Sequence, residues 1–157
     1  MAVEVGQKAP EFTLHDADRE QRSLSEFQGK NVVLAFYPGA FTGVCTTEMC
    51  NFRDRMSDFN SLNAQVLGIS VDGAFSQKVF SDQNNLNFPL LSDFARQVVN
   101  QYDVALPNFA GMDGYVAAQR AVFVVDKEGV VRYRWIAPNP GVEPDYDEVK
   151  QAVEGLG

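Results

Sequence analysis

The residues most suited to chemistry in this chain lie around Cys45. Pro38, Thr42 and Cys45 follow one another at intervals of four and three residues, between an apolar run and a segment with helical periodicity. We expect Cys45 in the first turn of that helix, where unpaired backbone N–H groups and the helix dipole favour a negative charge. Because the thiolate is the nucleophilic form of cysteine, this position favours covalent or redox chemistry at sulfur.

Attack of a thiolate on a peroxide would also need donors that align the substrate and stabilise the departing oxygen. The Thr42 hydroxyl is expected over the same helix end. Arg120, at the start of a later apolar run, would supply a fixed cation. Pro38 has no N–H group and would shield the sulfur from water. The alternative is that Cys45 is an inert core thiol and Arg120 a surface charge.

The elements that must position these residues follow from hydrophobic periodicity. Residues 31–37 form an uninterrupted apolar run ended by Pro38-Gly39, which predicts a central strand. From residue 42 the apolar positions recur every three or four residues, as on one helix face. We also predict a hairpin at 9–15 and 21–25, strands at 65–70, 88–91, 120–126 and 130–136, and helices near 74–83, 94–102 and 143–153.

This order, a βαβ half followed by a ββα half, predicts an α/β protein with the thioredoxin-like fold. A central mixed sheet would be flanked by helices, and the first hairpin would be an N-terminal extension. At 157 residues the chain is expected to form one domain, 1–157.

The composition narrows the classes of partner. A formal charge of −8, without any Lys/Arg-rich run, argues against nucleic acid and anionic membrane surfaces as partners. The N-terminal residues lack the pattern of a secretory signal, so we expect a soluble, cytoplasmic protein. Two cysteines and a single histidine, His15, are too few for a tetrahedral metal site. We therefore expect no metal and no other cofactor, and give His15 no role.

The stretch Pro38-Gly-Ala-Phe-Thr42-Gly-Val-Cys45 fits the Pro-x-x-x-Thr-x-x-Cys signature of peroxiredoxins, and 120–126 looks like the family's arginine-bearing strand. With matching segments at 10–14 and 88–93, the chain resembles the alkyl hydroperoxide reductase E and bacterioferritin comigratory protein (peroxiredoxin Q) groups. The resemblance implies that Cys45 is the peroxidatic nucleophile, that Thr42 and Arg120 activate it, and that Pro38 shields it. It further implies that Glu48 orients the arginine.

The implied activity is a thiol peroxidase that reduces hydrogen peroxide and small organic hydroperoxides through a sulfenic acid on Cys45. The resemblance implies thioredoxin or another thiol as reductant, and it favours a homodimer. No metal, haem or flavin is implied.

The sequence is compatible with two roles for Cys50. Its distance of five residues from Cys45 matches the resolving cysteine of some peroxiredoxin Q proteins. On a regular helix, however, positions i and i+5 are ~8.6 Å apart between Cα atoms, beyond the ~7 Å that a disulfide spans. Either the first helical turns unwind so that Cys50 forms the disulfide, or Cys50 is a core thiol and an external thiol reduces Cys45 directly.

Two other functions compete with this one. A thioredoxin-like disulfide reductase would carry Cys-x-x-Cys at the helix tip, whereas the spacing here is Cys-x-x-x-x-Cys. A chaperone or redox-sensing module would oxidise at Cys45 without turnover. The segment 107–115, next to Arg120, is expected to line the pocket, to form a subunit contact, or to be an ordinary loop.

Overall fold

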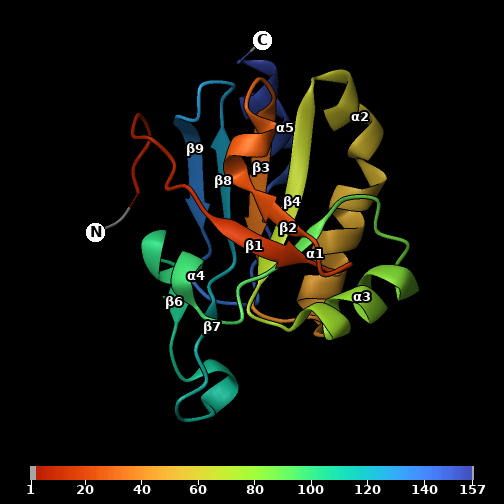
Figure 1. Cartoon of the computed structure of the whole chain (residues 1–157), viewed down its shortest axis with the longest axis vertical. Coiled ribbons are helices and arrows are strands. Elements are labelled where there is room, and N and C mark those ends of the chain that lie inside the picture. Colours follow the sequence, from red (N-terminus) through yellow and green to blue (C-terminus); the bar gives the residue numbers. More distant parts are fainter. Residues whose placement is uncertain (1–2, 157) are drawn as a thin grey trace.

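The computed structural model describes residues 3–156 and is built on one seven-stranded sheet of order β2-β1-β5-β4-β3-β8-β9 (Figure 1). A second, two-stranded sheet pairs β6 with β7. The strands are β1 (Thr13–Asp16), β2 (Gln21–Ser23), β3 (Asn31–Phe36), β4 (Ala64–Ser70), β5 (Leu90–Ser92), β6 (Ala105–Leu106), β7 (Ala117–Ala118), β8 (Ala121–Val125) and β9 (Val131–Ile136). The helices are α1 (Gly43–Asp54), α2 (Met56–Ser61), α3 (Ala74–Gln83), α4 (Gln97–Gln101) and α5 (Tyr146–Glu154), with 3-10 turns η1 (Leu24–Phe27) and η2 (Phe109–Gly111).

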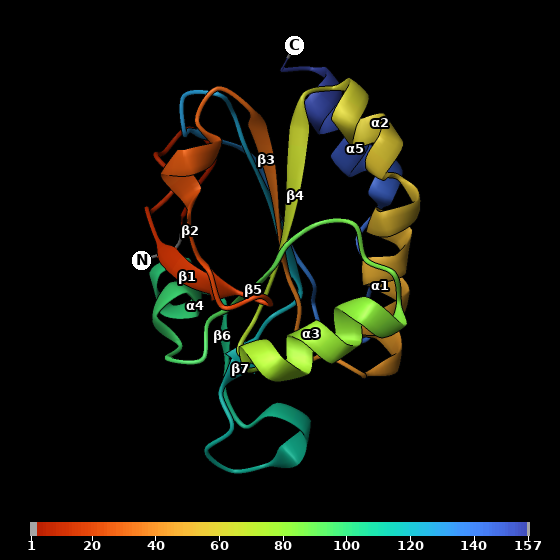
Figure 2. The same cartoon turned by 45° about the vertical axis from the view of Figure 1, so that its right-hand side comes forward.

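The strand predicted at 31–37 is confirmed as β3, and it is buried along its whole length. Alternate side chains of β3 enter two apolar layers, one on each face of the sheet. Figure 2 shows α1, α2 and α5 on one side of β3 and β4, and the N-terminal hairpin with α4 on the other. A strand covered on both faces has no polar alternation, which is why its sequence is a continuous apolar run.

The pairing of β3 with its neighbours decides where the site forms. β3 runs parallel to β4 and antiparallel to β8, and Phe36 is opposite both Ile69 and Ala121. The chain leaves β3 at the same edge of the sheet where it enters β8. Residue 120 therefore lies beside the loop that follows residue 36.

Most predicted elements are confirmed, including the N-terminal hairpin and the helix at 74–83, which has the predicted bounds. The helix that begins after Thr42 is interrupted at Arg55, which separates α1 from α2. The helix predicted near 94 begins later, at Gln97. There the buried Asp93 carboxylate accepts hydrogen bonds from the N–H groups of Val98 and Val99.

The last helix also begins later than predicted, at Tyr146 instead of residue 143. Pro144 lies just before it, and the Asp145 side chain accepts a hydrogen bond from the N–H group of Glu148, so Asp145 is the N-cap. The small sheet formed by β6 and β7 was not predicted, since each strand has only two residues. The segment between them forms the arm that extends below the sheet in Figures 1 and 2.

Within residues 3–156, no helix combines the length and the apolar character needed to cross a bilayer.

Candidate active site

Cys45 lies in the first turn of α1, as the sequence predicts. The helix begins at Gly43 and Thr42 is its N-cap residue. The first N–H groups of a helix have no partner within it, so they and the helix dipole face the region of the sulfur. Cys45 is fully buried and its thiol is free. A negative charge on this sulfur would be stabilised by the helix end, without bulk water.

Arg120 brings a second positive charge to the same atom. Its Nη2 donates to Cys45 Sγ over 3.1 Å, and its Nη1 donates to Glu48 Oε1 over 2.6 Å. Its Nε and Nη2 also donate to the Pro140 carbonyl, over 3.1 and 2.9 Å. Arg120 is only 2% exposed, so this guanidinium is fixed between the sulfur, a carboxylate and a backbone oxygen. The structure thus brings together three residues that the sequence singled out separately.

Glu48 is the buried partner of Arg120. Burial raises the pKa of its carboxyl group to about 7, although the neighbouring guanidinium acts in the opposite direction. Its second oxygen, Oε2, is buried and has no hydrogen-bond partner among the described residues. For Arg120 the balance is different: burial lowers its pKa, but the charges of Glu48 and Cys45 outweigh burial and leave the pKa raised. Arg120 is therefore a permanent cation, whereas Glu48 can gain a proton near neutral pH.

Thr42 and Pro38 complete the wall on the loop side. The Thr42 hydroxyl donates to the Gly39 carbonyl over 2.9 Å, so its proton is already used and its lone pairs remain available as acceptors. Pro38 is buried. A mainly apolar pocket of about 260 Å³ lies against Cys45. The residues that line it are Pro38, Thr42, Gly43, Val44, Cys45, Phe109, Arg120, Pro140 and Gly141.

Two residues near the site, Asp72 and Pro140, were not predicted from the sequence. The Asp72 carboxylate accepts hydrogen bonds from the N–H group of Ala40 (2.7 Å) and from the Ser70 hydroxyl (2.8 Å), so it holds the loop between β3 and α1. The signal that would have found Asp72 is its place just beyond β4, at the same edge as the end of β3. Pro140, which the sequence indicated only as the end of a strand, also lines the pocket. Of the three expectations for segment 107–115, pocket lining is confirmed at Phe109.

Comparison with known proteins agrees with this geometry. The family model described as the AhpC/TSA family matches residues 5–134. Peroxiredoxin Bcp of Bacillus subtilis is 38% identical over 136 residues, which covers 86% of this chain and 86% of that protein. The chloroplastic peroxiredoxin Q of Triticum aestivum is 42% identical over 131 residues, 83% of this chain and 58% of the relative. This chain belongs to the AhpC/TSA family of peroxiredoxins.

Solved structures support the same conclusion. The peroxidoxin BcpB of Mycobacterium tuberculosis superposes with a TM-score of 0.87 at 28% identity, over 99% of each chain. A peroxiredoxin-like protein from Aquifex aeolicus gives a TM-score of 0.89 at 31% identity, over 100% of this chain and 90% of the other. The thioredoxin-like fold predicted from the sequence is confirmed, and the chain is a thiol-dependent peroxidase.

The other sequence candidates lie outside the pocket of this peroxiredoxin. Cys50 is partly buried on α1, and its thiol donates to Asn84 Oδ1 over 3.7 Å. His15 is in β1, which β5 and β4 separate from β3. No group of three or more potential metal ligands occurs within residues 3–156.

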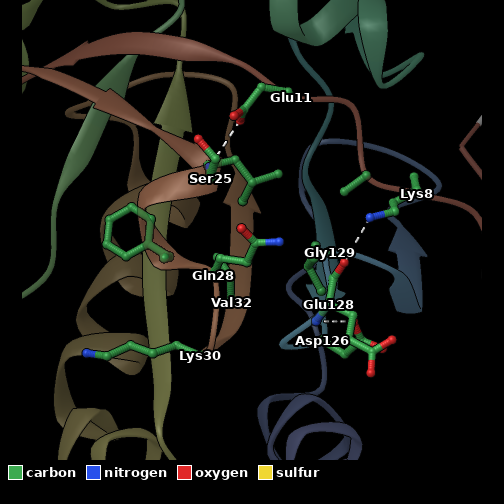
Figure 3. Close-up of a pocket in the computed structure, with 13 residues that line it drawn as sticks. Lys8, Glu11, Ser25, Gln28, Lys30, Val32, Asp126, Glu128 and Gly129 are labelled. Carbon is green, nitrogen blue, oxygen red and sulfur yellow. Dashed lines mark hydrogen bonds between the residues drawn. The ribbon is translucent and has the colours of Figure 1, made fainter.

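A second hollow, of about 220 Å³, lies at the opposite end of β3 (Figure 3). Its floor includes Val32, and its rim carries charges of both signs. The Lys8 ammonium group donates to the Glu128 carbonyl, and the Glu11 carboxylate accepts from the N–H group of Ser25 (Figure 3). None of the residues that line this hollow lines the pocket at Cys45.

Proposed function

We propose that Cys45 is the residue oxidised by the peroxide. Its thiolate attacks one peroxide oxygen, the O–O bond breaks, and the other oxygen leaves as hydroxide or alkoxide and takes up a proton. The sulfur is oxidised to sulfenic acid while the peroxide is reduced to water or an alcohol. The observation that carries this proposal is the 3.1 Å contact between buried Arg120 Nη2 and Cys45 Sγ at the helix end.

The neighbouring residues take the following roles in the proposal. Arg120 favours the thiolate and stabilises the negative oxygen as it leaves. The Thr42 hydroxyl, which already donates to Gly39, accepts a hydrogen bond from the peroxide and so aligns it with the sulfur. Glu48 holds the guanidinium in place. Pro38 shields the sulfur from water.

For the return to the reduced state we propose that Cys50 acts as the resolving cysteine, with an external thiol such as thioredoxin reducing the resulting disulfide. Both thiols belong to α1 and are free, and Cys50 is the more accessible of the two. The alternative, direct reduction of the sulfenic acid by an external thiol, leaves Cys50 without a chemical role.

The substrates proposed are hydrogen peroxide and small organic hydroperoxides, because the pocket of about 260 Å³ exceeds the size of hydrogen peroxide and its lining is mainly apolar. Two free cysteines suit a reducing compartment, which supports a cytoplasmic location. We further propose one catalytic domain over residues 1–157, active as a homodimer.

Intact-mass analysis after one equivalent of hydrogen peroxide tests both cysteine roles. We expect the wild type to lose two hydrogens as a disulfide forms, and Cys50→Ser to gain one oxygen. Cys45→Ser should stay unmodified under these conditions. A wild type that gains one oxygen would assign recycling to an external thiol, and a Cys45→Ser variant oxidised as fast as the wild type would exclude Cys45 as the nucleophile.

A further inference from the structure

The disulfide of the proposed recycling step requires α1 to change shape, and the following inference rests on that step. Cys45 and Cys50 are five residues apart on a continuous helix, and such positions are separated by ~8.6 Å between Cα atoms when ~7 Å is the limit. Cys45 is fully buried, whereas Cys50 is partly exposed. Part of the helix must therefore unwind to bring the two sulfurs together.

The backbone of the first half of α1 has features that disfavour a helix. Gly43, Thr46 and Thr47 have low helix propensity, and the side chain of Thr42 does not cap the helix. The hydroxyls of Thr46 and Thr47 donate to the carbonyls four residues earlier, at 2.8 and 3.1 Å, an arrangement that slightly destabilises helices. In this half of the helix Arg120 holds the side chains of Cys45 and Glu48, whereas the contacts that hold Cys50 lie further along the helix.

Cys50 and the second half of α1 are held by the residue that ends α3, Asn84. Asn84 Oδ1 accepts the hydrogen bond of the Cys50 thiol (3.7 Å), and the Asn84 backbone carbonyl accepts one from Arg53 Nη1 (2.6 Å). Asn84 Nδ2 donates to the Phe80 carbonyl over 2.9 Å. This third bond fixes the orientation of the amide, so its oxygen, and not its nitrogen, faces Cys50.

We propose that Asn84 is a latch that keeps Cys50 within α1 and thereby sets the rate of disulfide formation. In that step the Cys50 thiol attacks the sulfenic sulfur of Cys45, an S–S bond replaces the S–O bond, and the oxygen leaves with two protons as water. The contact with Asn84 uses the thiol proton, so it is lost when Cys50 ionises or leaves the helix. Asn84 is thus a positioning residue for the second chemical step.

The latch also affects the fraction of Cys45 that is oxidised beyond sulfenic acid. While Cys50 is held, the sulfenic acid can react with a second peroxide, which transfers an oxygen to sulfur and leaves as water or an alcohol. The product, a sulfinic acid, is outside the disulfide cycle. Slower release of Cys50 therefore means a larger sulfinic fraction at high peroxide.

The test compares Asn84→Ala with wild type by acid quench and intact mass at successive times after one equivalent of hydrogen peroxide. Loss of one hydrogen bond predicts disulfide formation about two- to tenfold faster. At excess peroxide the sulfinic fraction should fall correspondingly. Asn100→Ala is the matched control, because Asn100 likewise donates to the carbonyl four residues earlier but lies in α4, and it should behave as wild type.

A structural role alone would lower the stability of Asn84→Ala without accelerating the second step. Arg53→Met, which removes the other contact to Asn84, provides a second test and should also accelerate disulfide formation. Unchanged or slower disulfide formation in both variants would overturn the latch and leave the role of Cys50 intact. A wild type that forms no disulfide would instead overturn the recycling proposal and the latch with it.

Discussion

Replacing Glu48 by Gln should make the stability of the protein respond differently to pH. The glutamine side chain is isosteric with the protonated carboxyl group and cannot ionise. In the wild type, burial raises the pKa of Glu48 from its ordinary value of 4.5 to about 7, against the attraction of Arg120. Between these two pH values the folded state binds more protons at Glu48 than the unfolded chain. The free energy of unfolding therefore falls as pH rises through this window.

The size of the effect follows from the pKa difference. One pKa unit corresponds to about 1.4 kcal/mol, so a shift from 4.5 to about 7 amounts to about 3 kcal/mol once Glu48 is fully ionised. Part of this cost is already present at pH 5, since the unfolded carboxyl group is then largely ionised. Between pH 5 and pH 8 the stability of Glu48→Gln relative to wild type should therefore rise by about 2 to 3 kcal/mol.

The assay is urea unfolding of both proteins at pH 5, 6, 7 and 8, with Cys45 kept reduced. The difference between the two proteins cancels the titration of groups that they share. Glu154→Gln, which neutralises an exposed carboxylate on α5, is the matched control and should show only a small pH-dependent difference from the wild type. If the difference between Glu48→Gln and wild type is the same at all four pH values, Glu48 does not change protonation in this range. Burial would then not be the main influence on the pKa of the Glu48 carboxyl group.

Three further variants test the groups around the sulfur. Arg120→Lys keeps the charge but loses the planar guanidinium group that reaches Cys45. The rate of Cys45 oxidation, followed by intact mass, should therefore fall about 100-fold or more. A near-normal rate would show that Arg120 takes no part in the mechanism. Thr42→Val should lower the rate of Cys45 oxidation about tenfold, whereas Thr42→Ser, which keeps the hydroxyl, should have a rate close to that of the wild type. Equal rates for the two variants would show that the hydroxyl is not used. Asp72→Ala leaves the N–H group of Ala40 without its acceptor, so the free energy of unfolding, measured in urea, should fall by about 1 to 3 kcal/mol. Asp72→Asn should lower this free energy by a smaller amount. Equal decreases for the two variants would contradict a hydrogen-bonding role of Asp72.

Local sequence patterns were enough to predict most of the fold. The apolar run at 31–37 and the helix at 74–83 have a periodicity that depends on their own residues, so the structure reproduces them closely. The break at Arg55 between α1 and α2 was not visible, because the apolar spacing continues across it and both Met56 and Phe59 remain buried. The start of α4 depends on Asp93, whose capping role becomes clear only when its buried contacts are known.

The site residues likewise fall into those that the sequence predicts and those that only the tertiary structure shows. Pro38, Thr42 and Cys45 are close in sequence, so their spacing alone predicted a helix tip carrying a thiol. The partner of Arg120 is 72 residues away, and only the resemblance to a family suggested it. The place of Asp72 just beyond β4 is a sequence signal, but its hydrogen bond to the N–H group of Ala40 is visible only in the tertiary structure. Pro140 interacts with Arg120 through a backbone carbonyl, which leaves no recognisable pattern in the chain.

The contact between Arg120 and Cys45 depends on the register of two strands. Phe36 pairs with Ala121, so the residue before β8 is beside the residue after β3. A slip of one residue between these strands would move Arg120 by about 3.3 Å and turn its side chain to the other face of the sheet. A contact of 3.1 Å would not survive either change. β3 and β8 are buried at every position and place alternate side chains in two apolar layers. The pairing of these two buried strands therefore sets the distance between the cation and the sulfur.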